Sequence, residues 1–159
     1  MTKINYENTY IYKIVCKDLN INKSYCGSTS NFIKRKSHHK FVCNNETHKN
    51  YNLPLYVYIN SNGGWDNFDM LLIEKNSFNN NLECRKRERE YYELLNSQLN
   101  IRKPYLSDDE KELYYKEYTK NYNNENKDYF KEYYQNNKDK FNKKKEINHD
   151  LIHKHYTID

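Results

Sequence analysis

Apolar and aromatic residues form short runs in the first two thirds of the chain, and turn residues separate these runs. The first run, residues 10–16, is the β-branched and aromatic mixture of a buried strand. Turn-forming residues follow at 17–23, and a second run, 24–26, ends at Gly27. This pattern predicts a β-hairpin. Residues 68–74 have the length and apolar content of a central strand, and they predict a third strand.

A helix is expected directly after Gly27. The Ser-Thr-Ser run at 28–30 offers hydroxyl groups for its N-cap. Phe32, Arg35 and His39 then follow at spacings of three and four, which places them on one helical face. This face combines an aromatic ring, a permanent cation and an imidazole.

Two more helices are expected later in the same part of the chain. One begins near Pro54, with Asn52 as its N-cap, and ends at the Asn-Gly-Gly of 62–64. The other covers about 81–96. The residues between the first two helices, 41–51, are polar and predict a loop.

Glu88 is the unusual residue of the helix at 81–96. It lies at helical spacings of four, three and four among packing residues, namely Cys84, Tyr91 and Leu95. A carboxylate on a packing face needs a cation, a metal ion or strong hydrogen-bond donors, because burying it unpaired is costly. A salt bridge to Arg85 or Arg87, or a helix edge open to water, would also satisfy it.

From Ser107 onward the chain is rich in Lys, Glu, Tyr and Asn and contains no Gly or Pro. An 11-residue repeat, equal to three helical turns, would align four rings on one long helix. These rings are Tyr118, Tyr122, Tyr129 and Tyr133. The stripe would pack on the preceding domain, pair with a second chain or stack on bases. A solvated helix that frays or is partly disordered is the alternative.

A lysine cluster follows the tyrosine stripe. Its members are Lys138, Lys140, Lys143, Lys144 and Lys145. They are candidates for phosphate contacts, although a solvated charge run would have the same composition.

Charge separates the two parts of the chain. The 159 residues carry a formal net charge of +5, and hydrophobic residues make up 36%. Up to Ser107 the chain has 16 basic and 10 acidic residues, whereas the remainder has 11 and 12. A basic head suits a polyanionic partner, although many proteins that never bind nucleic acid are as basic.

Cysteine and hydropathy patterns exclude several classes of protein. The four cysteines form no CxxC pair, and neither they nor the histidines have zinc-ligand spacing, so zinc is not expected. The longest aliphatic run, 70–73, is far too short to cross a membrane, and no secretion signal opens the chain. The sequence therefore predicts an intracellular protein without a membrane segment, located in cytoplasm or nucleus.

The order of motifs resembles the GIY-YIG nuclease superfamily, in particular its homing-endonuclease branch, which has viral and mobile-element members. Tyr-Ile-Tyr at 10–12 and Tyr-Cys-Gly at 25–27 correspond to the two signature triplets, and Arg35 and His39 follow at the family spacing. Tyr10 stands where the signature has its first Gly. In the second triplet, Cys replaces the second Ile.

The resemblance covers residues 9–100 and implies an α+β fold. We expect a small three-stranded antiparallel sheet flanked by helices in a GIY-YIG-like nuclease domain. A Tyr/Lys/Asn-rich tail at 107–159 would follow as a long C-terminal helical or partly disordered arm. The arm also offers a surface for self-association.

The resemblance assigns roles to five catalytic residues. Glu88, eight residues before the Asn of a Leu-Asn pair, would hold one Mg²⁺ or Mn²⁺ ion. Arg35 would bind the scissile phosphate. Tyr12 would activate water, and Arg35, the metal and His39 could lower its phenol pKa for this role. Tyr25 would lie beside it as a second phosphate or water ligand.

Substrate-binding residues are also implied. They are Gly27, Lys34 and Asn96, with Asn100 as a second choice for the family's asparagine. His38, His48 and Asn50 stay outside the catalytic set. The chain is thus expected to be a metal-dependent endonuclease that hydrolyses phosphodiester bonds in DNA. A non-catalytic nucleic-acid-binding protein on the same fold is the alternative, because the first signature Gly is missing.

Overall fold

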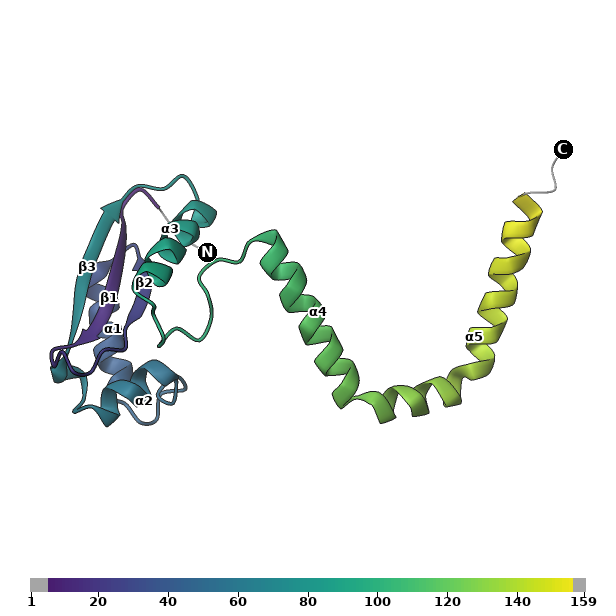
Figure 1. Ribbon diagram of the computed structural model, residues 1–159, viewed down its shortest axis with the longest axis horizontal. Helices are drawn as coiled ribbons and strands as arrows, with labels where there is room; N and C mark the ends of the chain where they lie inside the picture. Colours follow the sequence, from purple (N-terminus) through teal and green to yellow (C-terminus); the bar gives the residue numbers. More distant parts are fainter. Residues whose placement is uncertain (1–5, 156–159) are drawn as a thin grey trace. The chain divides into compact units, whose positions relative to one another are not determined.

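The computed structural model describes residues 6–155, with side chains described through Lys144 (Figure 1). The chain divides into two compact units, Met1–Leu106 and Ser107–Asp159. Two parts of the sequence-based interpretation lie outside the described residues. These are the last four residues of the predicted arm, 156–159, and the side chain of Lys145.

Three antiparallel strands form the sheet of the first unit, as predicted. They are β1 (Thr9–Cys16), β2 (Tyr25–Thr29) and β3 (Phe68–Asn76), in the order β2-β1-β3. The expectation that the third strand is central is wrong, since β1 holds the centre. β3 is an edge strand, and its Leu71 and Leu72 are 42% and 51% exposed.

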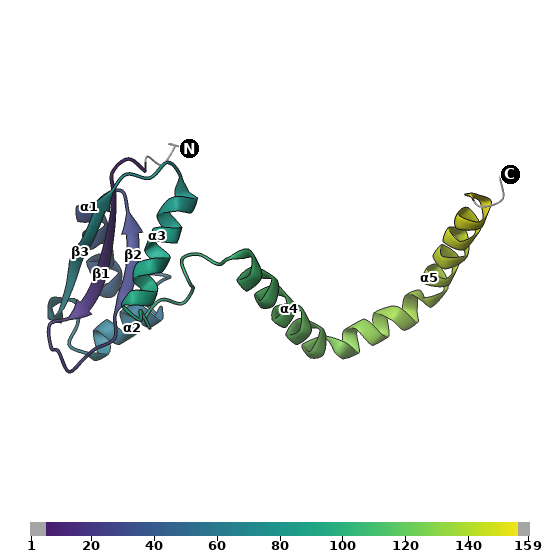
Figure 2. The same ribbon diagram turned by 45° about the horizontal axis from the view of Figure 1, so that its top comes forward.

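Helices lie against this sheet as the expected α+β fold requires. α1 (Phe32–Cys43) contacts α2 (Pro54–Ser61), and a 3₁₀ turn, η1 (Trp65–Asn67), leads into β3. α3 (Asn81–Leu94) runs beside β2 in both views (Figures 1 and 2).

Two expected N-caps are wrong. The cap of α1 is Asn31, whose side chain accepts from the Lys34 backbone N–H, and β2 extends to Thr29, so the strand includes two of the three residues expected at the cap. The cap of α2 is Leu53 rather than Asn52, and it has no side-chain hydrogen bond. Pro54 occupies the first helical turn, where a missing N–H costs nothing.

The core lies between the sheet and the pair α1 and α2. Alternate residues of β1 point into it, because side chains along a strand alternate between faces. It consists of Tyr12, Ile14, Cys16, Val42, Cys43, Leu55, Tyr56, Ile59, Trp65, Phe68, Met70 and Leu99. Cys26 of β2 points to the other side, where its Sγ lies 3.8 Å from the backbone oxygen of Glu88 in α3. β2 therefore has α1 on one side and α3 on the other.

The arm is helical in the described residues, in two helices rather than the expected single one. α4 (Asp108–Glu125) starts with a capping box between Ser107 and Glu110, and α5 (Lys127–His155) follows after Asn126. No residue of α4 is buried. None of the described helices is both long enough and apolar enough to span a membrane.

Candidate active site

Tyr12 and Tyr25 meet beside Gly27. Gly27 pairs with Tyr12 across the hairpin, and the rings of Tyr12 and Tyr25 have centroids 6.2 Å apart. A Cβ atom on residue 27 would lie 2.7 Å from Tyr12 Oη and 2.9 Å from Tyr25 Cε1, closer than side chains tolerate. The glycine is therefore needed for the two phenol rings to pack on the strand.

α1 extends this cluster from one helical face. Arg35 Nε donates to Tyr12 Oη at 3.0 Å, and Tyr12 Oη lies 2.9 Å from His39 Nε2. His39 Nδ1 lies 2.9 Å from the hydroxyl of Tyr56, which α2 supplies. The ring of Trp65 stacks on His39 with an interplanar angle of 8°. The structure thus joins Arg35, Tyr12, His39 and Tyr56 in one hydrogen-bonded chain.

Burial sets the protonation states of the side chains in this hydrogen-bonded series. Desolvation, with a smaller effect from Arg35, lowers the pKa of His39 from 6.5 to about 3, so its imidazole is neutral at physiological pH. A neutral ring has one donor and one acceptor nitrogen. If Nε2 accepts the Tyr12 proton, Nδ1 carries the hydrogen that points to Tyr56. This tautomer satisfies every hydrogen bond in the chain.

Burial, more than the neighbouring cation, determines the pKa of Tyr12. Burial raises this pKa well above its ordinary value of 10, and the charge of Arg35 offsets only part of the rise. Tyr12 has no exposed surface. Tyr25 is half-buried and lines the neighbouring pocket, and burial raises its pKa too. In this state both tyrosines are neutral phenols.

Glu88 approaches from α3 on the other side of β2. Ser28 Oγ donates to Glu88 Oε2 at 2.6 Å. Burial raises the pKa of the Glu88 carboxyl, while this hydrogen bond and the charges of Arg85 and Arg35 lower it in part. A hydroxyl and two nearby guanidinium groups therefore compensate the carboxylate that the sequence places on a packing face.

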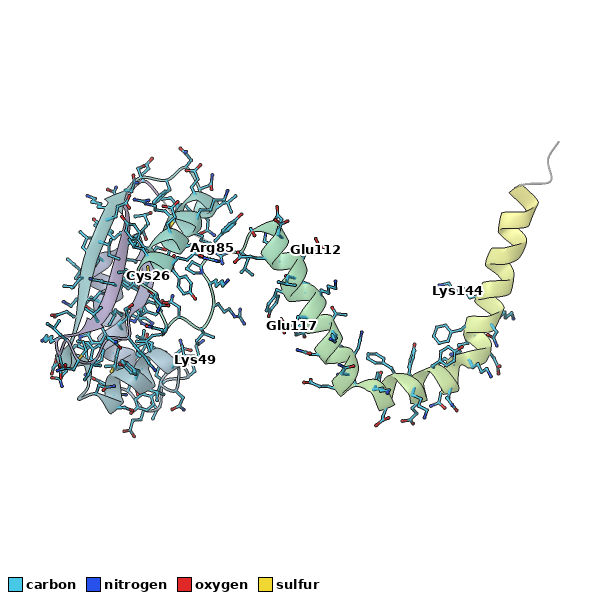
Figure 3. All side chains as sticks on the ribbon, in the orientation of Figure 1. Cys26, Lys49, Arg85, Glu112, Glu117 and Lys144 are labelled. Carbon is cyan, nitrogen blue, oxygen red and sulfur yellow. The ribbon has the colours of Figure 1, made fainter. Side chains whose placement is uncertain are left out.

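A pocket of about 530 Å³ connects these elements. Its lining includes Tyr25, Arg35, His39, Tyr56 and Glu88, together with three further cations. Those cations are Arg85, Arg102 and Lys103. Arg85, labelled in Figure 3, donates from Nε to the Pro104 backbone oxygen at 2.6 Å. The pocket therefore offers one carboxylate inside a positively charged wall.

The two candidate asparagines have different environments. Asn100 lines the pocket, and its side chain makes two hydrogen bonds with the Cys26 backbone, at 2.9 Å to N–H and 2.7 Å to C=O. Asn96 is exposed beyond the end of α3, with φ of 46°, and is not part of the lining. Lys34 is also exposed and outside the lining.

A family model for the GIY-YIG catalytic domain matches residues 8–103, more than half of the chain. The chain belongs to this GIY-YIG family. The match confirms the resemblance seen in the motifs and gives the first unit a nuclease-type fold. Searches of curated proteins and of solved structures find no match to the chain.

The GIY-YIG motif residues fall in and around the pocket. Tyr12, Gly27, Arg35 and His39 form one contact network, and Glu88 lies in the same pocket as Arg35. Tyr10, which replaces the first motif glycine, packs on Phe32 with ring centroids 6.2 Å apart. It does not disturb the pairing of β1 with β2.

The residues fit the divalent metal that the GIY-YIG family implies. In the part of the chain that the structure describes, no group of three His, Cys, Asp or Glu side chains could enclose an ion. Mg²⁺ does not need such a cage, since it keeps several waters and often takes one or two carboxylates. The Glu88 carboxylate, beside the Ser28 hydroxyl and on the pocket wall, has the chemistry that such a ligand requires.

The sequence did not indicate that Tyr56 and the cations Arg102 and Lys103 line the pocket, nor that Ser28 contacts Glu88. Tyr56 and Leu55 share one apolar run, and nothing in the spacing separates a packing ring from a pocket hydroxyl. Arg102 and Lys103 follow the last expected helix in a segment without periodicity. Asn50, which sequence reasoning left aside, lines the pocket, while His48 contacts the rings of His38 and Phe41.

Proposed function

We propose that this GIY-YIG domain is a metal-dependent endonuclease that hydrolyses phosphodiester bonds in DNA within the cell. The observation that carries the proposal is the hydrogen-bonded chain from Arg35 through Tyr12 to His39, located beside the pocket that contains Glu88. Hydrolysis needs a phosphate-binding cation, a proton acceptor for water and a carboxylate that can hold a metal. These residues supply all three.

Arg35 would bind the scissile phosphate. Its guanidinium is charged at any working pH and reaches the pocket from α1. Because Nε donates to Tyr12 Oη, the guanidinium now covers a phenol that has no exposed surface. A phosphate in the pocket would draw the guanidinium toward itself and open Tyr12 to water. Substrate binding would then expose the proton acceptor.

The attacking water would lose its proton to Tyr12. The water oxygen forms a bond to phosphorus and the bond to the 3′-oxygen breaks. At the same time Tyr12 Oη takes the water proton and passes its own proton to His39 Nε2. His39 passes its Nδ1 proton to Tyr56, which lines the pocket and returns a proton to solvent. No charged imidazole builds up, which suits the low pKa of His39.

Glu88 would hold one Mg²⁺ or Mn²⁺ ion together with water molecules. The ion supplies Lewis-acid stabilisation of the departing 3′-oxygen when bound. Ser28 keeps the carboxylate oriented through its hydrogen bond at 2.6 Å. Arg85, Arg102 and Lys103 would bind flanking phosphates on the pocket wall.

The complete burial of Tyr12 and the replacement of the first motif glycine by Tyr10 favour one second candidate. This is a non-catalytic nucleic-acid-binding protein on the same fold. It would use the same basic pocket without cutting.

A plasmid-nicking assay tests the proposal. Purified protein is incubated with supercoiled DNA in Mg²⁺ or in EDTA, next to Glu88→Gln and Arg35→Ala. Both variants should lose roughly 100-fold or more of the nicking rate, as EDTA should for the wild type. Glu90→Gln is the matched control, because it makes the same change on an exposed face of α3 and should nick normally.

Absence of nicking by the wild type in Mg²⁺, with salt-sensitive DNA binding retained, would support the non-catalytic candidate instead. Nicking that survives in Glu88→Gln would contradict the assignment of the metal ligand.

A further inference from the structure

The arm carries a row of exposed aromatic rings along α4 and the first half of α5. Successive ring centroids lie 5.5 to 6.4 Å apart, and each ring is 36% to 61% exposed. The members of this row are Tyr114, Tyr118, Tyr122, Phe130, Tyr129, Tyr133, Phe141 and Tyr134. Rings packed only on one another leave much apolar surface in water, which indicates an interaction surface.

The two helices of one arm cannot cover this row by folding onto each other. Only Asn126 separates them, whereas an antiparallel helix pair needs a connection of about two to five residues. The backbone N–H and the side chain of Asn126 both donate to Tyr122 O, and Asn126 O accepts from Phe130 N–H at 3.0 Å. Hydrogen bonds thus tie the connection at Asn126 to both α4 and α5. The partner of each helix must come from elsewhere.

Charge indicates the kind of partner. α4 has six acidic and three basic residues, and residues 127–144, a segment of equal length, have six basic and three acidic residues. A nucleic acid would be repelled by α4. An antiparallel copy of the same arm would instead place each acidic half on a basic half.

The complementarity extends to single positions. About a two-fold axis through Asn126, each residue of one copy lies level with the residue equally far on the other side of 126 in the second copy. Five level pairs then have opposite charge, and no level pair between 108 and 144 has like charge. The pairs are Asp108 with Lys144, Asp109 with Lys143, Glu112 with Lys140, Lys120 with Glu132, and Glu125 with Lys127. Glu112 and Lys144 are labelled in Figure 3.

The same register matches the rings. Tyr122 faces Phe130 of the second copy, and Tyr118 faces Tyr134. Tyr114 faces Lys138, a cation–π pair. In a parallel pairing, by contrast, the acidic α4 would lie beside a second acidic α4, and the basic part of α5 beside its own copy, so the net charges would repel.

We propose that residues 108–144 form an antiparallel dimerisation surface whose partner is a second copy of this chain. The aromatic row supplies the apolar contact, and the opposite charges at level positions favour the antiparallel direction and this register. This inference does not depend on the nuclease activity.

Sedimentation velocity of the full chain over a range of concentrations tests the proposal. The wild type should form a dimer whose fraction rises with concentration. Glu112→Lys or Lys140→Glu alone creates two like-charge contacts per dimer and should weaken association roughly tenfold. The double variant restores opposite charges and should return to near wild-type association. Glu117→Lys makes the same charge change opposite Gln135 and should behave like the wild type.

Tyr118→Ala adds a test of the aromatic row. It should weaken association roughly tenfold or more while circular dichroism shows unchanged helix content, since no residue of α4 is buried. A wild type that stays monomeric at all concentrations overturns the proposal. So does a dimer in which the double charge swap fails to rescue the single variants, because that result excludes the antiparallel register.

Discussion

The hydroxyl of Tyr12 and the Nε2 atom of His39 lie 2.9 Å apart inside the core, with 0% and 1% of the two residues exposed. A phenol and an imidazole so deeply buried must satisfy each other, because an unpaired polar group there would be costly. The pair also links the sheet to α1, since Tyr12 is in β1 and His39 is in the helix. It has measurable consequences for stability as well as for chemistry.

The free energy of unfolding should fall as the pH is lowered from 7 to 5.5. The folded chain holds the pKa of His39 near 3, whereas the unfolded chain protonates this histidine around 6.5. The unfolded state thus binds more protons below pH 6.5, and stability present above this value is lost as the pH falls. The loss from His39 should be about 1 kcal/mol at pH 5.5. Urea denaturation at several pH values measures it.

His39→Gln provides the comparison for this pH dependence. The variant should be less stable at pH 7, and its stability should change less between pH 7 and 5.5, because position 39 no longer titrates. The difference between the two pH profiles isolates His39 from Glu88, whose raised pKa acts in the opposite direction. Parallel profiles for the two proteins would show that His39 is not the buried neutral group described here.

Gly27→Ala should destabilise the fold by about 1–3 kcal/mol, the usual cost of overpacking. The added Cβ atom would lie 2.7 Å from Tyr12 Oη and 2.8 Å from Tyr12 Cζ, so the ring must move. The hydrogen bonds from Tyr12 to Arg35 and His39 would be strained as a result. Thermal unfolding of Gly27→Ala beside the wild type checks the prediction. If Gly27→Ala left the stability unchanged, that result would contradict the close approach of the Tyr12 ring to residue 27.

The strands, the ring-bearing face of α1 and the position of Glu88 were all predictable from the sequence. Each follows from a period or a motif spacing, which local residues determine. The true cap of α1 at Asn31 was not predictable with confidence, because Ser28, Thr29 and Ser30 have equally good capping side chains. The length of β2 excludes Ser28 and Thr29, and Ser30 lies between the strand and the cap. The order of the strands was not predictable either, because the apolar run of β3 does not show that β3 is an edge strand with one side unpaired.

Asn100→Ala should cost about 1–3 kcal/mol of stability, because it leaves the N–H and C=O of Cys26 without their side-chain partner. Asn96→Gly should be neutral or slightly stabilising, since φ of 46° suits glycine. Urea denaturation compares the two variants. Equal destabilisation would contradict the different environments of the two asparagines.

Glu88→Gln should increase the free energy of unfolding at pH 7 by about 1 kcal/mol, the order of the cost of a partly compensated buried charge. The raised pKa of Glu88 means that its ionised form disfavours folding, and this cost grows as the pH rises through the folded-state pKa. Glutamine can still accept from Ser28. The gain should therefore disappear below about pH 4, where the unfolded carboxyl is protonated as well. Urea midpoints at both pH values test this, and a loss of stability at pH 7 would contradict it.

The pocket shows what spacing alone cannot reveal. Arg102 and Lys103 reach it only because the chain after α3 returns to β2, where Leu99 N–H donates to Ser24 O at 3.1 Å. That return is a tertiary contact between residues far apart in sequence. No periodic pattern in the sequence predicts this contact, so the cations on the pocket wall can be identified only from the folded structure.

The side-chain amide of Asn100 has one more consequence. By donating to and accepting from the Cys26 backbone, it takes the place that the next peptide of a neighbouring strand would occupy on β2. A strand edge closed in this way offers a poor template to another chain, so it resists edge-to-edge aggregation. Any additional strand, whether an insertion in a relative or an unwanted partner, would therefore join more readily along β3, on the side of the sheet away from the pocket.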